Sequence, residues 1–238
     1  TGASGDVLLH NSRLLHIDLD AIDQICLSHG HYDHTGGLMA VLQQMKRRIP
    51  VLAHPDIFAP KLKARTVLEY IGLPFIRSQA EAAGAVMLEC RGPVPLAQGL
   101  TTTGEIPRLE GFEKVEGFWT VRDGQYGPDI IPDDQALAAV LPDRGLAVIT
   151  GCAHSGIINT IRQAQRITGV DELYAVIGGF HLMGADRERI DATARALLKL
   201  DPAVIRPGHC TGQRAVCQLQ QALGERCQPL AVGETINL

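Results

Sequence analysis

The sequence LSHGHYDHTGG, residues 27–37, places three histidines, one aspartate and one tyrosine at positions 29–34. The preceding residues 21–28, AIDQICLS, predict a strand that ends near Ser28. Residues 38–48, LMAVLQQMKRR, have apolar side chains at helical spacing and predict a helix. The cluster is therefore expected on a strand-to-helix loop, a common position for active sites in α/β proteins.

The second half of the chain repeats this arrangement three times. Strand-like segments at 146–150, 173–177 and 203–207 each precede a glycine-containing loop with a histidine, and a helical pattern follows each loop. The loops are GCAHSG (151–156), GGFHLMG (178–184) and GHCTG (208–212). If these strands and the strand before residues 29–34 lie side by side, their ends lie along one edge of a sheet, and the histidines of all these loops are expected to converge there.

The chain has nine histidines, and the loops that follow apolar strands contain six of them: His29, His31, His34, His154, His181 and His209. Neutral imidazole is the commonest protein ligand for zinc and also suits iron and nickel. The HxHxDH segment holds more donors than one ion needs and fewer than two ions need, so ligands from distant loops are expected. We predict a metal site and assign structural roles to His10, His16 and His54.

Composition narrows the functional class. The 238 residues have a net charge of -4 and a pI near 6.1, which disfavours a nonspecific nucleic-acid surface. No apolar run reaches the roughly 18 residues of a membrane span. The six cysteines form no CxxC pair, which is typical of thiols in a reducing compartment and predicts a cytoplasmic protein. Without a visible linker, a single domain over residues 1–238 is expected; homo-oligomerisation is left open.

Other segments are less regular. Residues 60–71 predict a helix with Leu62, Leu68 and Ile71 facing inward. Residues 104–132 are interpreted as a long irregular loop that carries Trp119, and specificity is expected to depend on residues 90–132. Residues 136–150 predict a hairpin around a Pro-Asp-Arg-Gly turn.

The motif HGHYDH resembles the HxHxDH signature of the metallo-β-lactamase superfamily. Together with ITGCAHSGIINTI, GGFHL and RPGHCTG, it resembles most closely a branch of metal-dependent hydrolases labelled dihydropterin-ribofuranosylaminobenzene phosphate synthase-like. The resemblance implies a four-layer αββα sandwich with the site along one edge. The opening TGASGD resembles the segment after the superfamily's second strand, so the first strands are expected to be missing from this chain.

The resemblance also implies two divalent-ion positions, with zinc expected and iron, manganese or nickel also suitable. It assigns His29, His31 and His154 to the first ion, and Asp33, His34 and His209 to the second. Cys152 stands where the superfamily usually has a bridging aspartate; a thiolate can bind one metal, or Asp133 or Asp134 supplies the carboxylate. His181 has no counterpart in the basic motif set and is expected to contact substrate, to donate a proton or to support a ligand.

These features together predict a metal-dependent hydrolase in which a metal-activated water attacks an ester-type bond, such as a phosphoester or phosphodiester of a small molecule. Asp33 is expected to bind the second metal and orient the water, and His181 to protonate the leaving group. Arg206 is a candidate phosphate contact, although a surface or helix-facing role is favoured. The alternatives are a metal-stabilised ligand-binding or regulatory module and an iron-based redox enzyme; a nuclease is disfavoured by the acidic balance.

Overall fold

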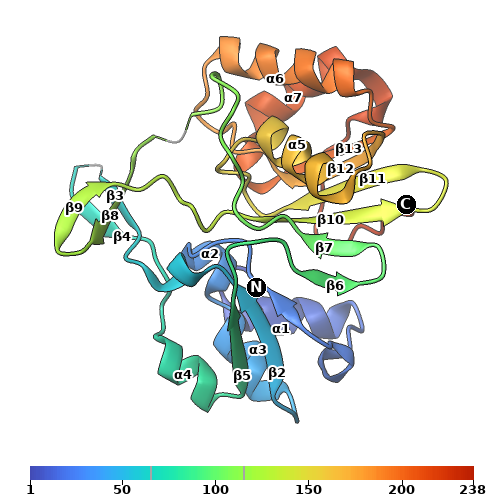
Figure 1. Cartoon of the computed structure of the whole chain (residues 1–238). Helices are drawn as coiled ribbons and strands as arrows, with labels where there is room; N and C mark the ends of the chain where they lie inside the picture. Colours follow the sequence, from blue (N-terminus) through green and yellow to red (C-terminus); the bar gives the residue numbers. More distant parts are fainter. Residues whose placement is uncertain (65, 115) are drawn as a thin grey trace. The chain divides into compact units, whose positions relative to one another are not determined.

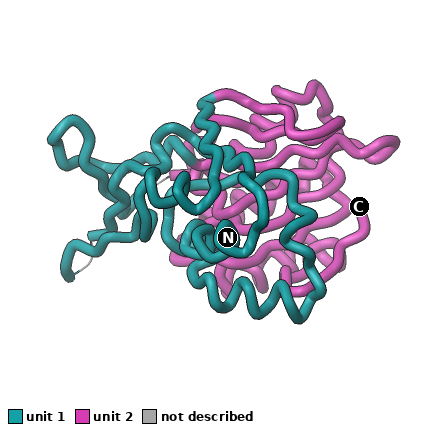
Figure 2. Tube along the Cα trace, turned by 90° about the horizontal axis from the view of Figure 1, so that it is seen from below, with its two compact units in different colours: residues 1–91, 116–133 teal, residues 92–115, 134–238 magenta. Residues whose placement is uncertain are grey.

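A computed structural model of the chain describes residues 1–64, 66–114 and 116–238. Internal contacts divide it into two compact units, which Figure 2 shows in teal and magenta. Unit 1 comprises Thr1–Arg91 and Glu116–Asp133, and unit 2 comprises Gly92–Val115 and Asp134–Leu238. Each unit has its own sheets and hydrophobic core. The expected single-domain organisation stays a prediction.

The first sheet of unit 1 is parallel, and the histidine motif follows its strand β1. Its strand order is β1-β2-β5. These strands and their helices are β1 (Ile25–Cys26), β2 (Ile49–Ala53), β5 (Ala85–Glu89), α1 (Gly5–Leu14), α2 (Tyr32–Thr35), α3 (Leu38–Gln44) and α4 (Arg77–Ala82). Ile49 and Val51 of β2 are fully buried and pack with Leu38 and Leu42 of α3. The predicted strand, loop and helix around the motif are confirmed, although β1 is short and α3 ends before Lys46.

The second sheet of unit 1 corrects two predictions. Its order is β4-β3-β8-β9, and all neighbours are antiparallel. The strands are β3 (Leu62–Ala64), β4 (Leu68–Tyr70), β8 (Phe118–Arg122) and β9 (Gln125–Pro128). The helix predicted over residues 60–71 is wrong: Leu68 is 56% exposed, and the segment forms β3 and β4 because it pairs with β8. Residues 104–132 likewise contain a hairpin, in which Trp119 stacks on Tyr126 with ring centroids 5.0 Å apart.

Unit 2 contains a six-stranded sheet with the order β13-β12-β11-β10-β7-β6. The strands are β6 (Pro95–Ala97), β7 (Leu100–Thr102), β10 (Ala136–Leu141), β11 (Gly145–Thr150), β12 (Leu173–Gly179) and β13 (Val204–Gly208). β10 and β11 form the predicted hairpin, with Ala136 paired to Thr150. β11, β12 and β13 are parallel neighbours, so their carboxyl ends share one edge.

Three helices cover one face of this sheet (Figure 1). They are α5 (Ile157–Thr168), α6 (Arg187–Leu200) and α7 (Gln213–Leu223). Each contributes buried apolar residues to one core, such as Ile161, Leu197 and Leu219. The three predicted strand–loop–helix repeats are thereby confirmed. Among the described residues, no helix combines the length and the apolar character that crossing a membrane requires.

Candidate metal centre

The histidine motif is held in a defined shape between β1 and α2. His31 has an extended backbone (φ -84°, ψ 146°) and is the residue from which α2 begins. The Thr35 hydroxyl donates a hydrogen bond to the His31 carbonyl at 2.9 Å, which fixes the first turn. His29 and His31 are 0% and 5% exposed, and His34 is half-buried. The sequence thus buries two imidazoles where a strand turns into a helix.

The three imidazoles of the motif lie against one another. The Nε2 atom of His29 and the Nδ1 atom of His31 are 3.0 Å apart. The ring centroids of His29 and His34 are 4.2 Å apart, and the Ser28 hydroxyl lies 3.2 Å from Nδ1 of His29. The Asp33 carboxylate lies 3.7 Å from Nε2 of His34, so all four predicted donors of the motif gather on one short loop.

The environment of His31 favours the neutral ring. Burial, followed by the nearby positive charge of Lys61, lowers the pKa of His31 to about 3. Its ring also stacks on Phe118, with centroids 5.2 Å apart. A neutral imidazole at pH 7 keeps a lone pair available, which is the form that binds a metal ion.

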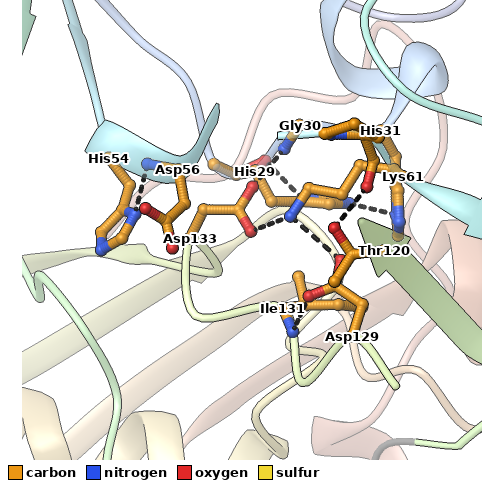
Figure 3. Close-up of polar contacts among 12 residues, drawn as sticks. His29, Gly30, His31, His54, Asp56, Lys61, Thr120, Asp129, Ile131 and Asp133 are labelled. Atoms are coloured by element: carbon orange, nitrogen blue, oxygen red, sulfur yellow. Dashed lines mark hydrogen bonds and ion pairs between the residues drawn. The ribbon is translucent and has the colours of Figure 1, made fainter. Parts of the chain in front are cut away.

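Gly30 is fixed by a carboxylate from a distant part of unit 1 (Figure 3). Its backbone N–H donates a hydrogen bond to Oδ2 of Asp133 at 2.7 Å. A Cβ atom at this position would lie 2.4 Å from the carbonyl oxygen of Ile57, so only glycine fits without a shift of the backbone. The residue between His29 and His31 is therefore held from both sides.

Asp133 also belongs to a buried ion cluster (Figure 3). The side chain of Lys61 is 0% exposed and forms ion pairs with Asp133 and, at 3.2 Å, with Asp129. Asp129 in turn accepts a hydrogen bond from the backbone N–H of Ile131, whose φ of 52° is unusual for a β-branched residue. Gly30 and Lys61 each contact one oxygen of Asp133, so this carboxylate holds the loop, and its role as a bridging metal ligand stays a prediction.

The loops of unit 2 bring further donors to the carboxyl edge of its sheet. Cys152 and His154 follow β11, His181 follows β12, and His209 and Cys210 follow β13. Ligand atoms of Cys152, His154 and His181 lie within 4.8 Å of one another, and so do those of Cys152, His209 and Cys210. The predicted convergence of the later loops is thereby confirmed.

The backbone of these loops is strained where the donors are presented. Ala153, His181 and His209 have φ values of 54°, 46° and 49°, a region that residues with a side chain seldom adopt. Such conformations cluster at functional sites because the surrounding structure must enforce them.

The Cys210 thiol has a lowered pKa. A hydrogen bond with the Cys152 thiol, and a weaker influence of His181, lower the pKa of Cys210 to about 5 against the effect of burial.

Asp134 supports the first of these loops as Asp133 supports the motif of unit 1. Its Oδ2 atom accepts a hydrogen bond from the backbone N–H of Ser155 at 2.7 Å, next to His154. Burial raises the pKa of Asp134 to about 6, although the hydrogen bonds from Ser155 oppose this shift. Consecutive carboxylates thus each hold a backbone amide beside a candidate ligand, each contact within its own unit.

The structure also tests the predictions made for the six loop histidines together, for His54 and for Arg206. The six loop histidines do not lie at the edge of one sheet, because the motif follows a strand of unit 1 and the other three follow strands of unit 2. His54 has the structural role expected of it, since its Nδ1 atom accepts a hydrogen bond from the N–H of Asp56 at 3.0 Å. Arg206 contacts Glu234 at 3.4 Å and backbone carbonyls, in agreement with the favoured structural role.

The sequence interpretation missed Lys61 and Cys210. No local pattern marks Lys61, because its partner Asp133 is 72 positions away. Cys210 follows His209 directly in GHCTG, and this adjacency to a predicted ligand was an available signal.

Comparisons with known proteins identify the family of the chain. The β-lactamase superfamily domain family matches residues 3–103. The 7,8-dihydropterin-6-methyl-4-(beta-D-ribofuranosyl)-aminobenzene-5'-phosphate synthase of Methanocaldococcus jannaschii is 36% identical over 243 residues, covering 100% of this chain and 82% of that protein. The uncharacterised protein MJ0448 of the same organism is 32% identical over 220 residues, covering 92% of this chain and 80% of that protein.

A solved structure is also similar. The crystal structure of Tm1679, a metal-dependent hydrolase of the β-lactamase superfamily, matches with a TM-score of 0.86 and 27% identity, covering 100% of this chain and 87% of that chain.

Proposed function

The chain belongs to the metallo-β-lactamase superfamily and has its mixed α/β fold, and on this premise we propose that it is a metal-dependent hydrolase. The proposed reaction is cleavage of an ester-type bond in a small molecule, with phosphoesters and phosphodiesters as the preferred class. The observation that carries the proposal is the clustering of metal-binding side chains after strands in both units: histidines in unit 1, and histidines with thiols in unit 2.

The donors fit a zinc-like ion. Buried neutral imidazole, carboxylate and thiol suit zinc, and iron, manganese or nickel bind subsets of the same donors. When bound, such an ion lowers the pKa of a coordinated water towards about 7 and stabilises negative charge that develops on the substrate. The ligand sets remain those implied by the resemblance, with two ions proposed: His29, His31 and His154 for one, and Asp33, His34 and His209 for the other.

Two side chains are proposed to act on the reacting groups. The Asp33 side chain is 34% exposed, so its carboxylate is accessible to a water molecule that it can orient beside its metal. His181 is half-buried, with its ring centroid 4.1 Å from that of His154. In this position it is proposed to donate a proton to the leaving oxygen, which is general acid catalysis.

The relatives suggest where to look for a substrate. The Methanocaldococcus jannaschii relative is named for a product that carries a ribofuranosyl 5'-phosphate, and it shares 36% identity with the whole of this chain. We therefore place phosphorylated ribosides first among the test compounds. The same identity supports a second candidate, a synthase reaction on a pterin and a phosphorylated riboside. None of the six cysteines, all among the described residues, forms a disulfide, which supports the proposal of a cytoplasmic location.

The test is a hydrolysis panel with a matched pair of histidine variants. Phosphomonoesters, phosphodiesters and carboxylic esters are offered to the zinc-loaded protein, to the chelator-treated protein and to the reloaded protein. We expect activity on one phosphoester class, loss with chelator and recovery with metal. His31→Ala should lower kcat/KM by more than about 100-fold, whereas His10→Ala, which replaces an exposed helical histidine, should not change it. A metal-loaded protein that is inert on every class would contradict the proposal and favour a binding module.

A further inference from the structure

Two cysteines of unit 2 lie together although they follow strands that are not neighbours. Cys152 follows β11 and Cys210 follows β13, and β12 lies between these strands. Strands separated by one neighbour are about 9–10 Å apart in a sheet. The Sγ atom of Cys210 nevertheless donates a hydrogen bond to the carbonyl of Cys152 at 3.4 Å.

The end of the intervening strand is shaped for this approach. Gly179 is the last residue of β12, and its backbone N–H donates a hydrogen bond to the Gly151 carbonyl at 3.2 Å. A Cβ atom on Gly179 would lie 2.7 Å from Sγ of Cys210 and 3.1 Å from Cα of Cys152. Any side chain here would displace the Cys210 thiol, so the glycine leaves the space in which the two cysteines meet.

We propose that Cys152 and Cys210 supply thiolate ligands to the ion that His209 is proposed to bind, which makes the site of that ion a sulfur–nitrogen site. The ligand atoms of these residues lie within 4.8 Å of one another. Two donors of one zinc ion, each at about 2.0–2.3 Å from it, lie less than about 4.6 Å apart, so ligand atoms gathered within 4.8 Å of one another can share an ion after small side-chain movements. The inference rests on the proposed function, because it requires a bound ion, and it adds the chemical nature of the ligands.

Cys152 has the central place in the cluster. Its ligand atom also lies within 4.8 Å of donors from His154 and His181, so it is common to both donor groups of unit 2. Cys152 is 3% exposed, and a buried thiolate needs a nearby positive charge, which a bound cation supplies. Thiolates select zinc, iron(II) or cobalt(II) over magnesium and calcium, which prefer oxygen ligands.

Burial alone does not explain the pair. Cys227 is 1% exposed and packs into the hydrophobic core of unit 2, where burial raises the pKa of its thiol to about 11. Cys152 and Cys210 instead lie among imidazoles at the edge where the strand-end loops meet. Cys227 therefore represents a cysteine with a purely packing role, whereas Cys152 and Cys210 have imidazole neighbours.

The test is cobalt(II) reconstitution of the full chain. Thiolate ligands give an intense sulfur-to-cobalt charge-transfer absorption in the near ultraviolet, whereas imidazole ligands give only weak visible bands. We expect this absorption in the wild-type protein, its loss in Cys152→Ser, and a loss of at least half its intensity in Cys210→Ser. The control Cys90→Ser replaces another half-buried cysteine, one from unit 1, and should keep the full absorption.

A second readout needs no variant and therefore does not depend on whether the variants fold. Zinc should slow alkylation of the half-buried Cys210 by iodoacetamide at least tenfold, whereas the exposed Cys217 should react equally with and without zinc. Visible cobalt bands without charge transfer, or equal alkylation of Cys210 with and without zinc, would overturn the thiolate site and leave the proposed function standing. A protein that binds no cobalt at all would overturn both.

Discussion

Replacing Lys61 by methionine tests whether the ion cluster behind the histidine motif holds that loop in place. Methionine has a similar length, but it leaves the buried carboxylate of Asp133 without its cation and leaves Asp129 only its longer contact with Arg122, at 3.6 Å. Removing one partner of a buried ion pair costs about 3–5 kcal/mol. Asp133 keeps its hydrogen bond from Gly30, and Asp129 keeps the one from Ile131, so the lower end of this range is expected.

For a chain of this size, about 3 kcal/mol corresponds to a fall in Tm of roughly 6–12 °C. Urea unfolding followed by the fluorescence of Trp119, the single tryptophan, reports on unit 1. The control variant Lys46→Met removes an exposed ion pair with Asp20 and should leave the free energy of unfolding nearly unchanged. Because Asp133 also holds Gly30, Lys61→Met should weaken zinc binding by about tenfold, the effect typical of a lost supporting contact.

The double variant Lys61→Met/Asp133→Asn gives a sharper measurement. It removes one buried negative charge together with the cation, so it should be less destabilised than the sum of the two single variants by at least about 1 kcal/mol. If Lys61→Met stays within about 1 kcal/mol of the wild-type protein, or if the two substitutions are additive, the proposed role of the cluster is wrong.

Three further predictions concern Gly30, Glu113 and the effect of the metal on stability. Gly30→Ala should lower stability by about 1–3 kcal/mol and zinc affinity with it, measured by denaturation and competitive titration, because its Cβ meets the Ile57 carbonyl; Gly92→Ala, which has open space, should change neither. Burial raises the pKa of Glu113 to about 7, so its contribution to stability is complete below about pH 4.5 and is lost as the pH rises through 7. Urea unfolding at a series of pH values should show that the free energy of unfolding falls between these limits and that Glu113→Gln removes this fall. The same fall in the Glu113→Gln variant would contradict the role of Glu113. Chelator treatment should lower Tm in differential scanning calorimetry, and free zinc at 100 times its Kd should add about 2.7 kcal/mol of stability; equal Tm values would argue against binding to the folded state.

The elements around the site were predictable because their patterns are local. Each of the three strand–loop–helix repeats shows its apolar strand, glycine-containing loop and helical spacing in consecutive residues. The hairpin of β8 and β9 had a similar signal that was overlooked: Asp123-Gly124 adopts positive φ values of 50° and 74°, which is the preferred Asp-Gly turn. The β3 and β4 segment had no such signal, since its strands are mostly exposed and depend on pairing with β8.

The candidate metal ligands could also be predicted from local sequence, whereas the residues that hold their loops in place could not. Histidines and a glycine are adjacent in HGHYDH, so the local sequence predicts metal binding by this loop. The contacts from Asp133 to Gly30 and to Lys61 span 103 and 72 positions, and only the folded chain reveals them. The sequence suggests Asp133 or Asp134 as a metal ligand, and this stays a prediction; the structure adds that each accepts a hydrogen bond from a backbone amide beside a candidate ligand.

The metal content of the purified chain, measured by mass spectrometry after equilibrium dialysis against zinc, examines the basis of these interpretations. We predict at least one tightly bound zinc ion per wild-type chain, approaching two at saturation, and less than half of the wild-type content in a His29→Ala/His31→Ala variant that keeps its circular dichroism spectrum. A wild-type chain that retains no zinc, or a variant that retains as much as the wild type, would contradict the assignment of the histidine motif as a metal site.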